Sequence, residues 1–144
     1  MRILLGITGG IAAYKAANLI RGFSELGHEV TAVPTENALR FIGKPTLEAL
    51  SGHPVETDMY VDVDMVRHVE LGQQADLIVI APATASIIAR LAAGIADDLL
   101  LNAVLASKAP VVLAPAMHTE MWQNSATRAN IETLAQRGIR VLEP

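Results

Sequence analysis

Three short runs in this sequence are almost entirely apolar, and each is too short for a helix of ordinary length. They lie at 3–7, 77–81 and 110–114. A strand that is apolar along its whole length must be covered on both faces, as the strands of parallel sheets are. Because stretches with helical spacing alternate with these runs, the sequence predicts an α/β fold with one doubly wound parallel sheet.

The remaining elements follow from breaks in the apolar pattern. Residues 29–33 are expected to form a further strand that Pro34 ends, and 139–142 to begin a last strand. Residues 52–66 hold prolines, glycines and acids, so we expect a loop there with at most one short strand. Helices are expected at 11–26, 35–42, 46–50, 84–106 (divided at Gly94) and 124–136.

Composition narrows the class of protein. The 144 residues suffice for one domain, which we expect to span 1–144. A net charge of −4 provides no basic surface for nucleic acid, and the lack of cysteine excludes disulfides and thiolate metal sites, so no metal is expected. The sequence has no run of 18 apolar residues and no signal-peptide pattern. We therefore expect a cytoplasmic protein with no membrane span.

The unusual stretches of the sequence all stand where a predicted strand ends. In chain order they are GITGG, VPTENA, IAPATAS and LAPAMHTEMW. In a parallel α/β sheet the carboxyl ends of the strands lie at one edge, and ligands bind there. The sequence therefore predicts a ligand site at this edge.

The first two of these stretches suit an anion. Gly9 and Gly10 would let backbone N–H groups approach a phosphate, although a tight strand–helix turn also needs a glycine. Thr35 places a hydroxyl where a dinucleotide site has an acid, which suits the phosphate of FMN better than the ribose of NAD. The same hydroxyl would equally well cap the helix that follows.

Small residues dominate the third stretch, where the 77–81 strand ends. Small side chains allow a flat ring to lie close to the backbone, and two hydroxyls are available to the polar edge of such a ring. Thr84 is alternatively explained as the cap of the next helix. The candidate cofactor-binding residues here are Pro82, Ala83, Thr84, Ala85 and Ser86.

Two of the four histidines are candidates for chemistry. His118 follows Met117 at a strand end, with Met121 and Trp122 close behind it. The methionines and the tryptophan are also explained as core residues, whereas a histidine in this place favours a function. His68, taken alone, suits a solvated or capping residue better than a catalyst.

Taken together, GITGGIAAYKA, HVEL, IAPATAS, ADDLL and PAMHTEMW resemble the flavin-dependent cysteine decarboxylases. The resemblance covers residues 1–144 and is strongest to the phosphopantothenoylcysteine decarboxylases of bifunctional coenzyme A biosynthesis proteins. It implies a flavodoxin-like, Rossmann-like three-layer sandwich that binds FMN. It also implies an FMN-dependent carboxy-lyase that converts 4'-phospho-N-pantothenoylcysteine to 4'-phosphopantetheine, and a homotrimer or a multiple of three such as a homododecamer.

The resemblance further implies roles for individual residues. His68 corresponds to the active-site base, and the family's PxMNxxMW motif corresponds to the stretch in which Met117, His118 and Met121 contact the substrate. In the implied reaction the cysteine thiol is oxidised to a thioaldehyde, which accepts the electrons left behind by CO₂. Histidine has a pKa suited to deprotonating a thiol near neutral pH.

The sequence departs from the family pattern in three ways. His118 and Ser86 each replace a usual asparagine, and no cysteine is present to supply the proton for the final reduction. The sequence also ends at Pro144, before the segment that carries this cysteine in the family. We therefore expect either a piece of a longer bifunctional chain or an activity that stops at decarboxylation.

Three other functions remain open at this point. A peptidyl-cysteine decarboxylase that forms aminovinyl-cysteine in peptide natural products needs no cysteine of its own. A prenyl-flavin synthase of the same superfamily is disfavoured because PAMHTEMW is not its pattern. A non-catalytic flavin-binding regulatory subunit would use the same fold without turnover.

Overall fold

The computed structural model describes residues 1–60 and 62–144. Within these residues the parallel strands form a five-stranded sheet in the order β2-β1-β3-β4-β5. The strands are β1 (Arg2–Ile7), β2 (Glu29–Pro34), β3 (Leu77–Ala83), β4 (Val111–Pro115) and β5 (Arg140–Val141). This order defines a flavodoxin-like fold, so the expected doubly wound parallel sheet is confirmed.

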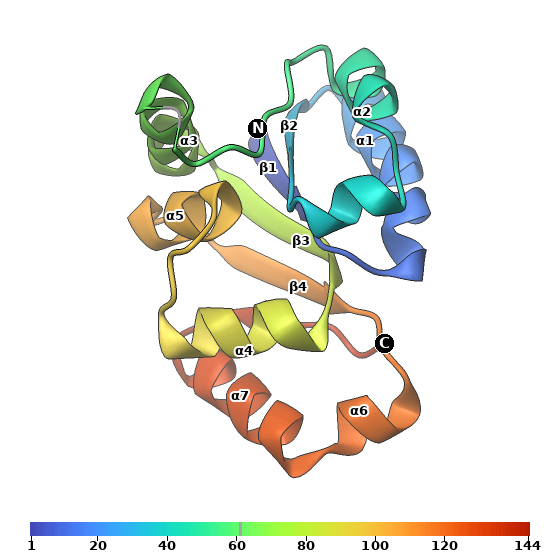
Figure 1. The fold of residues 1–144 in the computed structure, drawn as a ribbon, viewed down its shortest axis with the longest axis vertical. Coiled ribbons are helices and arrows are strands. Elements are labelled where there is room, and N and C mark those ends of the chain that lie inside the picture. The colour runs from blue at the N-terminus through green and yellow to red at the C-terminus, as the bar shows by residue number, and fades with distance from the viewer. Residues whose placement is uncertain (61) are drawn as a thin grey trace.

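Helices cover both faces of the sheet (Figure 1). One core lies between the sheet and α1 and α2, and a second lies between the sheet and α3, α4, α5 and α7. None of the helices in the described ranges is long and apolar enough to cross a membrane. The helices are η1 (Ile11–Lys15), α1 (Ala16–Glu25), η2 (Asn37–Arg40), α2 (Lys44–Ser51), α3 (Asp62–Gln74), α4 (Ala85–Ala93), α5 (Leu99–Ala106), α6 (Thr119–Gln123) and α7 (Ser125–Gln136).

Strand β1 shows why its sequence is continuously apolar. Ile3, Leu5 and Ile7 belong to the core on the α1 side, and Leu4 belongs to the core on the other side. None of these four side chains is more than 2% exposed. A central strand of a doubly covered sheet has no face left for polar residues.

The helix boundaries confirm some expectations and correct others. Gly94 ends α4 with φ 71°, a left-handed conformation that favours glycine, so the division of 84–106 is confirmed. Residues 62–74 form helix α3, so the loop expected up to residue 66 was wrong. The amphipathic pattern of α3 is weak because Val63 and Val66 are exposed while His68 and Gly72 are buried.

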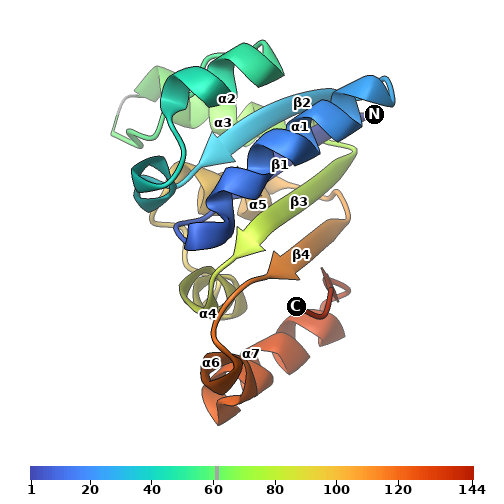
Figure 2. The same cartoon turned by 90° about the vertical axis from the view of Figure 1, so that its right-hand side faces the viewer.

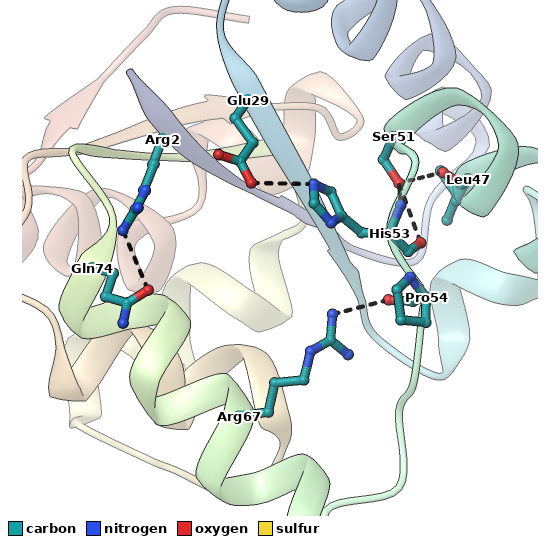
Figure 3. Close-up of polar contacts among 8 residues, drawn as sticks. All are labelled: Arg2, Glu29, Leu47, Ser51, His53, Pro54, Arg67 and Gln74. Atoms are coloured by element: carbon teal, nitrogen blue, oxygen red, sulfur yellow. Dashed lines mark hydrogen bonds and ion pairs between the residues drawn. The ribbon is translucent and has the colours of Figure 1, made fainter.

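The loop before α3 is tied to its neighbours by polar contacts (Figure 3). His53 lies 3.5 Å from the carboxylate of Glu29 at the start of β2, and Arg67 of α3 donates to the carbonyl of Pro54 at 3.3 Å. The chain then continues toward the carboxyl edge of the sheet. Residue 61, which falls inside the expected loop, lies outside the described residues.

Candidate active site

A cavity of about 430 Å³ lies at the carboxyl ends of β1, β2 and β3. Figure 2 shows the strand arrowheads pointing to this edge, where the short helices and the start of α4 gather. The residues that line the cavity come from the two strand ends that precede η1 and η2, from the segment before α3, and from the starts of α4 and α5. The predicted ligand edge of the sheet therefore contains a real cavity.

Of the two predicted phosphate-turn glycines, only Gly9 lines the cavity. A Cβ atom at Gly9 would lie 2.3 Å from Nδ2 of Asn37, which also lines the cavity. A Cβ atom at Gly10 would meet only Cγ2 of Thr84, at an ordinary 3.7 Å. The close approach of the Asn37 side chain therefore requires glycine at position 9 and not at position 10.

Thr35 and Thr84 both line the cavity, and the hydroxyl of each also accepts a backbone N–H near the start of a helix. Oγ1 of Thr35 accepts the N–H of Ala38, and Oγ1 of Thr84 accepts the N–H of Ile87, each at 3.2 Å. A hydroxyl that accepts one hydrogen bond still has its own proton to donate. Capping and ligand binding are therefore compatible at both threonines.

The far wall of the cavity is charged. Arg90 of α4 forms an ion pair with Asp97, and its Nε donates to Oγ of Ser86 at 3.4 Å. Asp98 caps α5 by accepting the N–H of Leu101 at 2.7 Å. Burial raises the pKa of the Asp98 carboxyl above its ordinary 3.8, and the neighbouring Asp97 acts in the same direction.

We expect Asp98→Asn to increase the free energy of unfolding near neutral pH. A raised folded-state pKa means that the contribution of Asp98 is fully present below its unfolded pKa and is lost as the pH rises through the folded value. The amide keeps the cap on Leu101 but removes the partly buried charge. Urea unfolding at a series of pH values should show a gain that vanishes toward about pH 3, where the carboxyl is protonated in both states.

Asp97→Asn is the matched control for this experiment. The Asp97 carboxylate is more than half exposed and pairs with Arg90, so its replacement should give no gain at neutral pH. Equal gains from both substitutions would contradict the assignment of the effect to the partly buried Asp98.

The structure places His68 within the helix layer and not on the cavity wall. Its side chain is 2% exposed, and it is absent from the residues that line the cavity. His68 is close enough to Glu56 to help lower the pKa of that carboxyl, after the N–H groups of Thr57 and Asp58 and the charge of Lys44. The role of His68 as a base therefore stays a prediction.

The stretch after β4 also lies outside this cavity. Met117 packs against the second core, His118 is exposed at the start of α6, and Met121 is 45% exposed. The guanidinium of Arg128 lies over the Trp122 ring, 5.0 Å from its centre. This cation–π contact joins α6 to α7 and gives the single tryptophan a structural role. The backbone of this stretch contacts one predicted cofactor residue, since the N–H of Ala116 donates to the carbonyl of Ala83 at 3.1 Å, but none of the residues that line the cavity belongs to 116–122.

The structure thus brings together part of the predicted cofactor set. Gly9, Thr35, Thr84 and Ser86 line the cavity, whereas Gly10, Pro82, Ala83 and Ala85 lie beside it in the chain. Sequence reasoning assigned no role to several other lining residues: Thr8, Asn37, Thr57, Asp58, Met59, Tyr60, Arg90, Asp97 and Asp98. Asn37 lies in the stretch VPTENA, and Asp97 and Asp98 lie in ADDLL, so the motifs of the sequence could have pointed to them. No sequence motif included residues 57–60. Among the described residues, no cluster of three or more histidines and carboxylates could hold a metal.

Comparison with known proteins defines the class first. The family model described as Flavoprotein matches residues 1–144, so the chain belongs to the flavoprotein family. The chain is 59% identical to the coenzyme A biosynthesis bifunctional protein CoaBC of Mycolicibacterium smegmatis, over 99% of this chain and 34% of that protein. It is 50% identical to CoaBC of Vibrio vulnificus, over 99% of this chain and 36% of that protein. The chain therefore spans about a third of the length of these curated relatives.

Solved structures of similar proteins share the fold. The FMN-dependent cysteine decarboxylase SpaF matches with a TM-score of 0.92 and 35% identity, over 100% of this chain and 84% of that chain. A mutant PPC decarboxylase complexed with pantothenoylaminoethenethiol matches with a TM-score of 0.89 and 35% identity, over 99% of this chain and 81% of that chain.

Proposed function

We propose that this chain is an FMN-dependent decarboxylase that releases CO₂ from 4'-phospho-N-pantothenoylcysteine in coenzyme A biosynthesis. The cavity at the ends of β1, β2 and β3 carries this proposal, because it combines a closely approached glycine with hydroxyl and amide donors. The 59% identity to CoaBC over 99% of the chain supports the choice of substrate. We further propose that residues 1–144 are one flavoprotein domain and that the protein works in the cytoplasm.

The donors around the cavity fit FMN. In flavodoxin-like sheets of this strand order, FMN binds at the switch point between β1 and β3, which is where the cavity lies. Gly9, Thr35 and Asn37 would hold the phosphate, and Thr84 and Ser86 would contact the polar edge of the ring. When bound, FMN would supply the acceptor for the two electrons released on oxidation of the substrate thiol.

The predicted catalytic and substrate-binding residues are proposed to act on the substrate. His68 would take the proton from the substrate thiol, and Met117, His118 and Met121 would contact the rest of the molecule. Met117, His118 and Met121 lie after β4, away from the cavity of the same chain. We therefore propose that the site is completed between copies of the chain in a homotrimer or a multiple of three.

Exposed apolar side chains support this assembly. Ile11 and Tyr14 on η1 are 81% and 59% exposed beside the end of β1, and Met121 on α6 is 45% exposed.

Light scattering of the purified chain should give a mass of three copies or a multiple of three. His118→Ala should keep this mass and the bound flavin but weaken substrate binding. A monomer that still binds flavin would contradict the proposed assembly.

We expect Gly9→Ala to weaken FMN binding about tenfold or more, because the new methyl group must displace the Asn37 side chain from the cavity. Gly10→Ala is the matched control and should bind FMN within about twofold of the parent, since its methyl group makes an ordinary contact. Titration of flavin fluorescence measures both constants. Equal losses in the two variants would contradict the role assigned to Gly9.

A peptide that ends in cysteine is the second candidate substrate, because the similarity to SpaF, an FMN-dependent cysteine decarboxylase, supports a cysteine substrate without specifying what the cysteine is attached to. The test is CO₂ release by the flavin-loaded chain from phosphopantothenoylcysteine and from such a peptide. We expect release from the first substrate only, with FMN as the cofactor recovered after heat denaturation. Release from the peptide alone would support the second candidate, and a chain that binds FMN without turnover would support a regulatory flavoprotein.

A further inference from the structure

Thr8 joins two walls of the cavity through a side chain that is 2% exposed. Its hydroxyl donates to the carbonyl of Pro82 at 2.7 Å and accepts the amide N–H of Thr84 at 3.1 Å. Its own amide N–H also donates to the Pro82 carbonyl, at 3.3 Å. One threonine just after β1 therefore binds both the Pro82 carbonyl near the end of β3 and the Thr84 amide that follows β3.

This bridge stands where the regular sheet pairing stops. The pairing of β1 with β3 ends at Gly6 and Ile80, and the register of β3 against β4 shifts between Ile80 and Ala83. The Thr84 amide lies beyond this irregularity, and the Thr8 hydroxyl takes the place of a strand carbonyl as its acceptor. A hydroxyl can accept and donate at once, which few other small side chains can do.

Thr84 in turn positions the start of α4. Its hydroxyl caps the helix through the N–H of Ile87 at 3.2 Å, and Ser86 follows it on the cavity wall. Gly9, next to Thr8 in the chain, lies close to Asn37, and both line the cavity. The distance between the proposed phosphate and ring contacts thus depends on Thr8.

We propose that Thr8 is a positioning residue of the FMN site, which acts through Thr84 and not through contact with the cofactor. The inference rests on the proposed function, because the affinity for FMN is used to measure whether Thr84 is correctly placed. The hydroxyl proton of Thr8 is committed to the Pro82 carbonyl, so the side chain has no donor left for the cofactor.

Thr8→Val tests the proposal because it keeps the shape of the side chain and removes the hydroxyl. The Pro82 carbonyl still receives the amide N–H of residue 8, but the Thr84 amide loses its acceptor. We expect FMN binding to weaken about tenfold or more, because an unpaired and partly buried amide disfavours the bound geometry. Thr8→Ser restores the hydroxyl and should bind FMN within about threefold of the parent, with the parent's visible circular dichroism of bound flavin.

Thr31→Val is the matched control. Thr31 is also a buried threonine of the sheet, 9% exposed in β2, and it faces a separate cavity near the amino ends of the strands. Its replacement should leave FMN binding within about twofold of the parent, as expected for a site remote from the ligand. Parent-like FMN affinity in Thr8→Val, or equal losses in Thr8→Val and Thr8→Ser, would overturn the proposal.

Hydrogen exchange of the unmodified chain gives a second test that needs no variant. Without FMN, the Thr84 amide should already be protected, because Thr8 holds it before the ligand arrives. An unprotected Thr84 amide would overturn the proposal even if Thr8→Val does not fold. If the parent chain binds no FMN, the proposed function fails, whereas the Thr84 exchange rate still decides whether Thr8 organises this wall.

Discussion

The variant His68→Asn is expected to bind FMN like the parent and to lose CO₂ release by a factor of about 10²–10⁴, the usual contribution of a positioned general base. Asparagine is close to histidine in size and forms hydrogen bonds, but it cannot take a proton from a thiol near neutral pH. Release of CO₂ from phosphopantothenoylcysteine by the flavin-loaded chain measures the loss.

This result would decide between two roles that the structure leaves to experiment. His68 is 2% exposed on α3, so its replacement could also act through packing. Urea unfolding of the same variant separates the two, because a base can be lost with little change in stability. Turnover retained near the parent rate would reassign His68 to a structural role.

His53→Asn is the matched control for His68→Asn. His53 is half-buried and pairs with Glu29 at the amino end of β2 (Figure 3). The cavity lies at the carboxyl ends of the strands, and His53 is not among the residues that line it. This exchange removes a histidine without touching the proposed site, so turnover should remain within about twofold of the parent. A large loss of CO₂ release in His53→Asn would show that the loss in His68→Asn cannot be assigned to the removal of a catalytic base.

Gly72→Ala is expected to lower the free energy of unfolding by about 3 kcal/mol, the upper end of the cost of overpacking a core. Gly72 of α3 packs directly on the backbone of α5. A Cβ atom there would lie 2.1 Å from the carbonyl oxygen of Ala103 and 2.8 Å from its carbonyl carbon. Because the neighbour is backbone, the strain is relieved only if the two helices move apart.

Gly22→Ala is the control, since Gly22 is also inside a helix but a Cβ atom there would meet nothing within 4 Å. This exchange should stabilise the chain by about 0.5–1 kcal/mol, the difference in helix propensity between alanine and glycine. Thermal unfolding should therefore show a midpoint lower by on the order of 10 °C for Gly72→Ala and a small rise for Gly22→Ala. A parent-like midpoint for Gly72→Ala would contradict the close packing of α3 on α5.

Much of the fold was determined by the sequence alone. The apolar runs at 3–7 and 77–81 identified central strands because these strands are buried on both faces, and Gly94 marked the end of a helix because its φ of 71° favours glycine. The same logic located the ligand edge, since parallel strands place all their carboxyl ends together. The local sequence pattern is enough to predict the structure wherever the burial of a residue follows from its position in its own strand or helix.

Only the tertiary structure decided the rest. Helix α3 escaped prediction because its buried face includes His68 and Gly72, whose burial depends on a close helix neighbour and not on hydrophobicity. The cavity likewise joins residues from five separate segments, and the roles of Thr8 and Asn37 come from partners that are distant in the chain. Contacts between distant segments leave no periodic trace in the sequence, because a single hydrogen bond or a single missing methyl group is enough to make them.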